Sequence, residues 1–584
     1  MDTLYVQGIG VSEGVRIAPA FIYRRKEAGG APAPAELPDD PGAIRAELSR
    51  LGEAKRRCAR QLEELAAKAA ETLGEDQAGI VTGQRRLLDD PAFYPKMEAW
   101  VQEKRVPAEQ AVAGIVEQVA GVFEAMSSDY MKERAADIRD IGGRLLNALA
   151  AKEDRGLSAI TERVILVADD LAPSDTIQLD PERVVGLITR SGGATSHTAI
   201  LARSLGIAAV VGAGSAIDGI ADGDLIAVDG AAGRCIVRPS EAEAELSRLR
   251  MEEGERERAA LARYAARPAV TADGTRVELA ANIGTAAEAK AAAAQGAGGV
   301  GLFRTEFLFM NAPAMPGEEE QFRAYREAAA AMDGRPVIIR TMDIGGDKAL
   351  PYLDLPREDN PFLGYRAIRI GLGRQDLLKV QLRAVLRASA FGNVKVMFPM
   401  ISGLQEWREA KGVLEEAKEE LRRSGTAFDE RIEAGIMVEV PSAAVMAGAF
   451  AREVDFFSIG TNDLVQYTLA VDRMNDKVAY LYDYFHPGVL QLIRQVIEAS
   501  HQAGKWTGMC GGMAGDPLAA PLLLGLGLDE WSMEAGRLGV IKKELSALDR
   551  EACCSLADSV LMLDTPQAVR QTLEEFRRAI GHTL

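Results

Sequence analysis

The chain has 584 residues, 47% of them hydrophobic and 26% charged, with a net charge of −18 at pH 7. One hydrophobic core does not serve a chain of this length, so we expect several domains of ordinary globular composition. The acidic balance argues against nucleic acid as a partner, because phosphate backbones bind basic surfaces. The sequence shows neither a signal peptide nor a run of roughly 20 apolar residues, so we expect a cytoplasmic protein without a membrane partner.

In the first part of the chain, the residue composition and the hydrophobic pattern change twice. Residues 1–23 alternate apolar and small residues and are predicted to form strands. Residues 40–153 place Leu, Ala, Glu, Lys and Arg at helical spacing, which predicts a helical bundle or a pair of helical hairpins. From Arg163 onward, short β-branched runs predict a small α/β unit. The helical region is therefore predicted to be an insertion between the first strands and that unit.

The second part of the chain predicts a barrel. A charged, helix-prone run over residues 240–265 precedes it, and we expect this run to be an arm between two bodies. Beyond Pro268, eight strand-like runs alternate with helical stretches, namely RVELAANIG, GVGLFRTEF, VIIRTMDIG, NVKVMFPMIS, AGIMVEVPS, DFFSIGTND, WTGMCGGMAG and LDEWSM. This order predicts a (β/α)₈ barrel. An open doubly wound sheet is the alternative, but the polar residues at the strand ends favour the barrel.

These patterns define a multidomain α/β protein. We expect an α/β domain from residues 1–30 and 148–238, an inserted helical domain from 31–147, a helical linker from 239–267 and a C-terminal (β/α)₈ barrel from 268–584.

Polar residues gather at the predicted carboxyl ends of the barrel strands, where barrel enzymes carry their catalytic groups. They are Arg304, Arg340, Glu439, Asn462, Asp463 and Cys510, with Arg473 ten residues beyond Asp463. Arginine matches the oxygens of a phosphate, carboxylates suit Mg²⁺, and an amide can donate to a substrate carboxylate. Any one of these residues could serve packing or an ion pair, but their convergence at one rim favours a site for a phosphorylated substrate.

A histidine begins the predicted helix in the run SGGATSHTAILARSLG. His197 lies where a turn enters this helix, hydroxyl side chains flank it, and Gly206 is placed to end the helix. Helix N-termini attract phosphate, and a neutral imidazole is a nucleophile near pH 7. By these features alone a structural capping histidine is the better interpretation, and only the surrounding motif changes it.

The motifs as a whole resemble one family. The run GGATSHTAILARSLGIAAVVG resembles the phosphohistidine signature of the phosphoenolpyruvate-utilising enzymes. The runs GLFRTEFLFM, IIRTMDIGGDK, NPFLGYRAIRI, GIMVEVPSA, SIGTNDLVQYTLAVDR and GMCGGMAGDP resemble the substrate barrel of that family. The inserted helices, with DYMKERAADIRDIG, resemble specifically the enzyme I family of the bacterial sugar phosphotransferase system, the phosphoenolpyruvate-protein phosphotransferases. The resemblance runs essentially from end to end.

The resemblance implies a role for each candidate residue. His197 is the implied phosphorylated nucleophile, and Thr176 in LAPSDT helps to hold its ring. At the barrel, the resemblance implies that Arg304, Arg340 and Arg473 bind the phosphate group. It implies that Glu439 and Asp463 bind Mg²⁺ beside the substrate and that Asn462 binds the substrate carboxylate. Cys510 is implied to protonate the enolate, which gives pyruvate. Phosphoryl transfer asks mainly for positioning and charge neutralisation, which such a set supplies.

The resemblance also implies partners. The phosphoryl group passes from His197 to a histidine of the phosphocarrier protein HPr, docked on helices within residues 76–93 and 130–142. Many family members have a histidine where this chain has Gln84, so the choice between a sugar-branch and a nitrogen-branch carrier stays open. A homodimer through the barrel is implied by the resemblance alone. Because His197 must reach both the barrel rim and the carrier, we expect the arm over 240–265 and the short linkers to act as hinges.

Three alternatives are weighed against this interpretation. Phosphoenolpyruvate synthase and pyruvate phosphate dikinase need an ATP-grasp domain, for which the helical insertion is too short and of the wrong texture. The nitrogen-regulatory form of enzyme I usually adds an N-terminal sensory domain, and we expect this chain to begin with the core. A degenerate, metabolite-sensing scaffold would have lost His197, a phosphate-binding arginine or a metal-binding carboxylate, and the sequence retains all of them.

Overall fold

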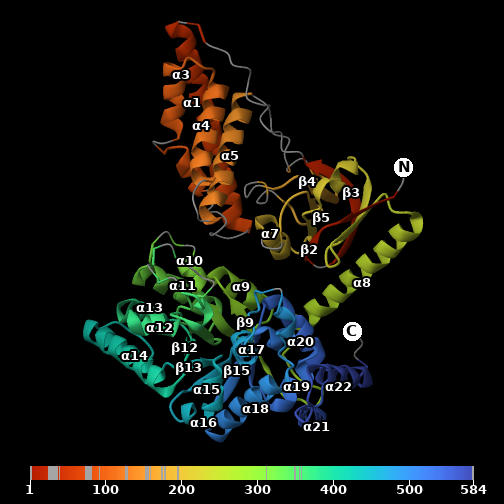
Figure 1. Ribbon diagram of the computed structural model, residues 1–584, viewed down its shortest axis with the longest axis vertical. Helices are drawn as coiled ribbons and strands as arrows, with labels where there is room; N and C mark the ends of the chain where they lie inside the picture. Colours follow the sequence, from red (N-terminus) through yellow and green to blue (C-terminus); the bar gives the residue numbers. More distant parts are fainter. Residues whose placement is uncertain are drawn as a thin grey trace. The chain divides into compact units, whose positions relative to one another are not determined.

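The computed structural model separates into two compact units, residues 1–257 and residues 258–584 (Figure 1). It describes residues 3–12, 14–23, 37–38, 40–72, 82–90, 93–124, 129–150, 157, 160–171, 175, 179–193, 196–310, 312, 314–346, 350, 352–353, 355–356, 358–475 and 477–581. The side chains of residues 68–72, 124, 129–134, 136, 197, 200, 201 and 204 lie outside the description. Within the described residues, no helix combines the length and apolar character needed to cross a membrane.

The first unit contains an eight-stranded sheet in the order β1-β8-β7-β3-β4-β5-β6-β2. Its strands are β1 (Leu4–Gln7), β2 (Ile9–Ser12), β3 (Val15–Tyr23), β4 (Val164–Ala168), β5 (Val184–Thr189), β6 (Ala208–Val211), β7 (Leu225–Asp229) and β8 (Arg234–Val237). Strands β3 to β6 pair in parallel, and the flanking strands pair antiparallel. The strands expected in residues 1–23 and the β-branched runs RVILVADD, RVVGLITR, AAVVGAG and DLIAVDG account for every strand except β8, whose short run RCIV joins β1 to β7.

Both faces of this sheet are buried. Alternate residues of β4 point to opposite faces, so Leu166 belongs to one apolar cluster and Ile165 to another. The first cluster includes Ala199 and Ala202 of helix α7 (His197–Leu205), which packs on that face. The second includes Ile217 of the 3₁₀ turn η2 (Gly214–Gly219). The packing of α7 on the sheet thereby fixes the position of the start of the helix.

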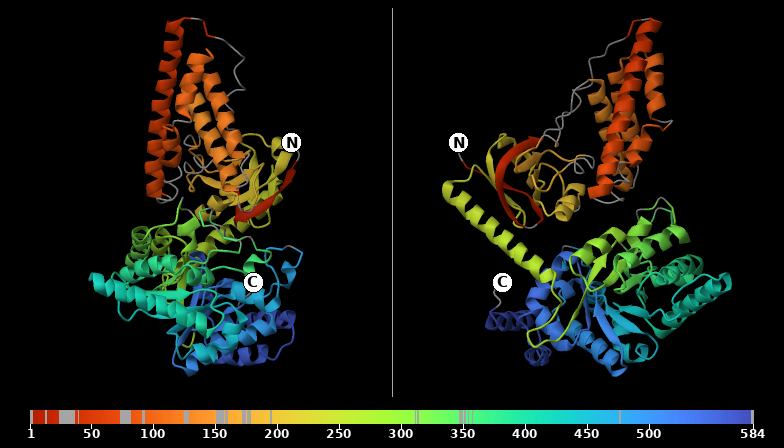
Figure 2. Two further views of the ribbon diagram at one scale, coloured as in Figure 1. Left: turned by 60° about the vertical axis from the view of Figure 1, so that its left-hand side comes forward. Right: turned by 180° about the vertical axis from the view of Figure 1, so that it is seen from behind.

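In the described part of the predicted helical insertion, the chain forms four helices of ten or more residues and a helical segment over residues 82–87. The four are α1 (Pro41–Thr72), α3 (Tyr94–Glu103), α4 (Ala108–Glu124) and α5 (Asp129–Leu149). Apolar residues at helical spacing bury themselves in one core, in which Leu62, Met97, Ile115 and Ile141 have no exposed surface. Figure 2 shows α1, α4 and α5 running alongside one another.

Helix α8 (Glu241–Ala265) occupies the predicted arm. At its start, Ser240 and Glu243 bond each other's backbone amides, and the Tyr5 hydroxyl donates to Glu243 Oε1 at 2.6 Å. At its end, Lys542 Nζ donates to the carbonyl of Ala265 at 2.6 Å. Between these anchors the helix is mainly exposed, and its only buried residues are Ala244 and Ser247.

The second unit is a closed parallel barrel of eight strands, as the strand-like runs predicted. The strands are β9 (Glu278–Ile283), β10 (Val300–Arg304), β11 (Val337–Arg340), β12 (Val394–Phe398), β13 (Ala434–Val438), β14 (Phe456–Ile459), β15 (Trp506–Met509) and β16 (Glu530–Met533). Strand β16 pairs with β9 and closes the ring. Closure rules out the open doubly wound sheet.

Helices cover the outside of the barrel (Figures 1 and 2). They are α9 (Ala286–Ala294), α10 (Glu306–Met310), α11 (Glu318–Ala331), α12 (Ile368–Gly373), α13 (Gln375–Ser389), α14 (Leu404–Ser424), α15 (Pro441–Val445), α16 (Ala447–Phe450), α17 (Thr461–Leu469), α18 (Pro487–Gln502), α19 (Ala520–Leu526), α20 (Leu538–Leu545), α21 (Arg550–Val560) and α22 (Pro566–Ala579). On β11, Val337 and Ile339 pack against the helices, whereas Ile338 fills the barrel interior.

We predict that Gly525→Ala destabilises the barrel unit. A Cβ at Gly525, on α19, would lie 2.0 Å from the carbonyl oxygen of Cys553 on α21, so the two helices must separate. We expect a loss of roughly 1–3 kcal/mol in the free energy of unfolding, the usual range for overpacking.

Gly412→Ala is the matched control, because this glycine lies within α14 with nothing within 4 Å of its added Cβ. The control should gain up to about 1 kcal/mol from helix propensity. Equal melting temperatures in thermal denaturation would contradict the prediction.

Candidate active site

The predicted phosphorylation motif forms the start of α7. His197 is the first residue of the helix, and Ser196 caps it, its hydroxyl accepting the Ala199 amide at 3.3 Å. Gly206 ends the helix in the left-handed conformation with φ 65°, as predicted. The His197 side chain and the whole of Thr176 lie outside the described residues. The structure therefore fixes the helix that carries His197 but does not describe its ring.

Gly192 shapes the loop before this helix. Its φ of 112° is a conformation that side chains rarely adopt, and an added Cβ would lie 3.2 Å from the Ser196 hydroxyl. The loop also contains an ion-paired arginine, because Arg190 bonds Asp169 at 2.6 Å and also bonds Asp218. Directly before α7, the Ser196 amide donates to the Gly193 carbonyl at 3.0 Å, and the first amides of a helix are groups that can bind an anion.

The barrel rim collects charged side chains from several strand ends. Within the described residues, four arginines and four carboxylates meet there, namely Arg304, Arg340, Arg366, Arg473, Glu306, Asp343, Glu439 and Asp463. Six of the eight are buried, with only Arg304 and Arg473 partly exposed. Burying so many charges requires that they compensate one another.

Arg340 is held by carboxylates on both sides. It bonds Glu306 at 2.5 Å and Asp343 at 3.2 Å, and its main-chain carbonyl accepts the Thr305 hydroxyl at 2.8 Å. Burial lowers the pKa of Arg340, but the neighbouring carboxylates outweigh that effect and raise the pKa above its ordinary value. Arg340 is therefore a permanent cation whose guanidinium is fixed before any ligand arrives.

Arg366 forms the second half of the same network. Its guanidinium lies 2.9 Å from Asp343 and 3.7 Å from Asp463, and it donates to the Tyr467 hydroxyl at 3.0 Å. Asp343 therefore bridges Arg340 and Arg366. Arg366 comes from the loop before α12 and not from a strand end, so the sequence analysis assigned it no role. The quoted run NPFLGYRAIRI was the only signal for it.

Glu439 has the most perturbed environment among the rim carboxylates. Burial raises its pKa to about 8, and Asp463 and Asp343 add to the increase, while Arg340 and Arg366 oppose it. One oxygen accepts the Met400 amide at 2.6 Å, and Met400 adopts a left-handed φ of 58°, a costly conformation for a residue with a side chain. The raised pKa means that burial and the two aspartates together outweigh the two arginines at this carboxylate.

Asn462 and Asp463 lie in the first turn of α17, near Glu439. Asp463 is buried, and its Oδ1 has no hydrogen-bond partner, although Arg473 lies 3.8 Å from it. The Asn462 Oδ1 accepts the Gly512 amide at 3.1 Å, which orients the side-chain amide group to offer its NH₂. The two neighbouring residues therefore present an unsatisfied anionic oxygen and an available donor.

Cys510 follows β15 and lies in the apolar cluster inside the barrel, with Met437 and Phe456. It is a free thiol with 4% of its surface exposed. Burial raises the pKa of Cys510 to about 11, Ser458 and Arg340 lower it, and Glu530 and Glu439 raise it. At neutral pH this thiol is protonated and can act as an acid, not as a thiolate nucleophile.

Arg304 differs from the other three rim arginines. It ends β10 directly beside Arg340, its register partner on β11. Among the described residues it has no ion pair, while Arg340, Arg366 and Arg473 each have at least one. The rim thus keeps one uncommitted guanidinium next to a fixed one, which suits a ligand anion.

The rim can also accommodate a divalent cation. Within the described part of the chain, no three side chains of the metal-binding kinds form a complete cluster. Glu439 and Asp463 supply two carboxylates, one with a raised pKa and one with an unpartnered buried oxygen. Mg²⁺ typically binds one or two carboxylates together with substrate oxygens and waters, so this incomplete set fits it.

The predicted docking helices are only partly described. Residues 76–81 and 91–92, and the side chains of residues 130–134 and 136, lie outside the description. Gln84 is fully buried, donates to Asp137 at 3.0 Å and has an Oε1 without a partner. Position 84 therefore belongs to the helical core of the insertion.

Comparisons with known proteins cover nearly the whole chain. Family models described as PEP-utilising enzyme match it in three parts: the N-terminal domain over residues 7–134, the mobile domain over 160–233 and the PEP-binding domain over 258–550. The phosphoenolpyruvate-protein phosphotransferase of Geobacillus stearothermophilus is 49% identical, over 97% of this chain and 96% of the relative. The protein of the same name from Bacillus subtilis is 46% identical, over 98% and 99% respectively. A solved structure of enzyme I (nEIt) is 34% identical, covers 43% of this chain and 99% of its own, and has a TM-score of 0.38.

We predict that Glu439 makes the metal-free barrel less stable as the pH rises. Its pKa of about 8 in the folded state exceeds the ordinary value of 4.5, so the folded protein binds the extra proton between these values. Stability therefore falls as the pH rises from about 4.5 to about 8. In EDTA, the melting temperature of the barrel should decline over this range in the wild type and decline less in Glu439→Gln, which retains the bond from Met400.

The matched control is Glu419→Gln, which alters an exposed carboxylate on α14. Its pH profile should follow the wild type. A Glu439→Gln profile that also follows the wild type would contradict the assignment of the raised pKa.

Proposed function

This chain belongs to the phosphoenolpyruvate-protein phosphotransferase family, and we propose from this premise that it moves the phosphoryl group of phosphoenolpyruvate to His197 and then to a carrier protein. The observation that carries the proposal is the rim itself. It combines fixed and uncommitted arginines, two carboxylates short of positive charge and a buried thiol, all at the carboxyl ends of the barrel strands.

In this proposal the phosphate group is bound by Arg304, Arg340 and Arg473. Arg340 is fixed by Glu306 and Asp343, so binding an anion costs it little side-chain entropy. Arg304 has no competing ion pair among the described residues, and Arg473 lies far enough from Asp463 to turn toward a ligand. The substrate carboxylate accepts the NH₂ of Asn462, which the Gly512 amide orients.

We assign Glu439 and Asp463 to Mg²⁺. The ion, when bound, neutralises charge on the transferring phosphoryl group. Support comes from the raised pKa of Glu439 and from the partnerless Asp463 Oδ1, which a nearby cation would satisfy. Glu306 and Asp343 keep the arginines in place, because removing either carboxylate would leave a buried guanidinium uncompensated.

The proposed chemistry has two parts. The bond between phosphorus and the enol oxygen breaks as a bond between phosphorus and an imidazole nitrogen of His197 forms. The enolate then takes a proton on its methylene carbon from the Cys510 thiol, which gives pyruvate. The raised pKa of Cys510 supports this role, since the proton stays on sulfur until a strong base such as the enolate is generated beside it.

The second transfer goes to the phosphocarrier HPr, which docks on the helical insertion. We also propose that two copies of the chain associate through the barrel and that the protein acts in the cytoplasm. A nitrogen-branch carrier is the alternative acceptor. Phosphotransfer to purified carriers of the two kinds distinguishes them.

We predict an acid-labile phosphoryl label on the protein after incubation with labelled phosphoenolpyruvate and Mg²⁺. The label should be absent in EDTA and in His197→Ala, because the first lacks the cation and the second lacks the nucleophile. Label that persists in His197→Ala would contradict the assignment of His197 as the nucleophile. The absence of label in the wild type would contradict the proposed activity and favour a sensing scaffold instead.

We predict that Cys510→Ala slows pyruvate formation by roughly 10²–10⁴-fold, the usual contribution of a general acid. The control is transfer of the phosphoryl group from phosphorylated HPr back to His197, which does not use the barrel and should keep its rate. If both rates fall together, the substitution has damaged the fold, and Cys510→Ser serves as the second variant. Unchanged pyruvate formation in both variants would exclude Cys510 as the acid.

A further inference from the structure

A cavity of about 530 Å³ opens at the end of the barrel opposite the candidate active site. It is lined by residues that precede strands, such as Arg276 before β9, Gly298 before β10 and Asp529 before β16. In a parallel barrel the amino ends of all strands share one face, so this cavity is separate from the rim that carries Arg304 and Cys510. Its volume lies in the usual range for small-molecule sites.

Cations outnumber anions around this cavity, although the whole chain carries a net charge of −18. The cations are Arg267, Arg276, Lys542 and Arg550, and the anions are Glu278 and Asp529. Asp529 is already engaged by His501 at 2.8 Å and by the Thr507 amide at 2.8 Å. Among the described residues, no ion pair joins Asp529 to the arginines or the lysine that line the cavity.

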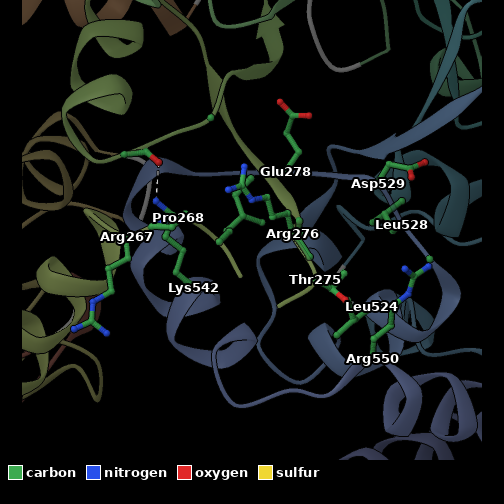
Figure 3. A pocket seen from close by; sticks show the side chains of 16 residues that line it. Arg267, Pro268, Thr275, Arg276, Glu278, Leu524, Leu528, Asp529, Lys542 and Arg550 are labelled. Carbon is green, nitrogen blue, oxygen red and sulfur yellow. Dashed lines mark hydrogen bonds between the residues drawn. The ribbon is translucent and has the colours of Figure 1, made fainter. Parts of the chain in front are cut away.

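The arginines at the cavity are uncommitted. Within the described residues, Arg276 and Arg550 form no ion pair, and Arg267 has only a contact with the Tyr264 ring at 5.2 Å. In Figure 3, Arg276 lies centrally, with Lys542 to one side and Arg550 to the other. Several arginines of the barrel helices do pair with glutamates, for example Arg383 and Arg387 with Glu318. Unpaired guanidinium groups that line one cavity favour an anionic ligand there.

Lys542 connects the cavity to the end of α8. It is 5% exposed, and its Nζ donates to the carbonyls of Ala265 at 2.6 Å and Gly296 at 2.7 Å. Arg267 and Pro268, which also line the cavity, follow α8 directly in the chain. A ligand there would touch the segment through which the linker helix joins the barrel.

We propose that this cavity binds a small organic anion with at least two negative groups, and that the bound anion stabilises the junction between α8 and the barrel. Arg276 binds the anion at the centre of the cavity, Arg550 holds one end of it, and Lys542 adds a fixed charge at the other end. A single inorganic phosphate would fill only part of the volume, whereas a tricarboxylate or a bisphosphorylated metabolite would fill more of it. This inference rests on the barrel alone and holds whether or not the proposed function is correct.

The test uses citrate and pyrophosphate as probes for carboxylate and phosphate chemistry, in isothermal titration calorimetry of the full chain at constant ionic strength. The variants are Arg276→Glu and Arg550→Glu. The matched control is Arg431→Glu, which reverses an exposed arginine just before β13, on the same end of the barrel but outside the cavity lining. Binding at the rim arginines is common to all of these proteins, so differences among them report on the cavity.

We expect the wild type and Arg431→Glu to bind at least one probe equally, and both cavity variants to lose at least tenfold in affinity. Hydrogen exchange should show that the probe protects residues 262–268 and 296–298 in the wild type and in Arg431→Glu only. Equal binding in all four proteins, no binding of either probe, or an equal loss in Arg431→Glu would overturn the site. Binding without protection of residues 262–268 would overturn its coupling to α8.

Discussion

Charge compensation at the barrel rim is the constraint on which the rest of the candidate site depends. Buried ions are costly, and removing one partner of a buried pair typically costs about 3–5 kcal/mol, because the other ion remains uncompensated. At the rim, ion pairs offset this cost. Asp343 bridges Arg340 and Arg366, and Glu306 pairs with Arg340 from the other side. The guanidinium groups are consequently fixed by the protein before substrate arrives, which is the condition for strong electrostatic catalysis.

The backbone around the rim meets the same constraint. Gly460 leaves room for Glu439, since an added Cβ would lie 3.1 Å from its Oε2. Gly511 allows an even closer approach, because its Cβ would lie 2.7 Å from the Thr461 amide nitrogen. Gln381 joins two strand ends by donating to Thr305 at 3.2 Å and accepting the Met342 amide at 2.8 Å. The compensation is nevertheless incomplete at Glu439, Asp463 and Arg304, and these three are the groups that a substrate anion and a cation would complete.

Part of this arrangement was predictable from the sequence. Hydrophobic periodicity and the repeated strand–helix order indicated the barrel, and barrel topology then placed Arg340, Glu439 and Asp463 at one rim. Arg366 was not predictable in this way, because it comes from a loop that no period locates. Likewise, the burial of Gln84 depends on packing between helices, and the strand β8, with four residues, is too short to stand out. The cavity opposite the rim could not be predicted from the sequence either, since its lining comes from segments far apart in the chain.

The exposure of helix α8 has a consequence for its thermal stability. Its middle is exposed, and its own stabilising contacts there are surface pairs such as Arg248 with Glu245 and Arg256 with Glu252. Surface pairs contribute little, and a helix of this kind without tertiary packing is marginal in water. Warming should therefore melt the centre of α8 while both cores remain folded. The two units would then be joined by a flexible tether, and chain statistics would set the effective concentration of His197 at the barrel.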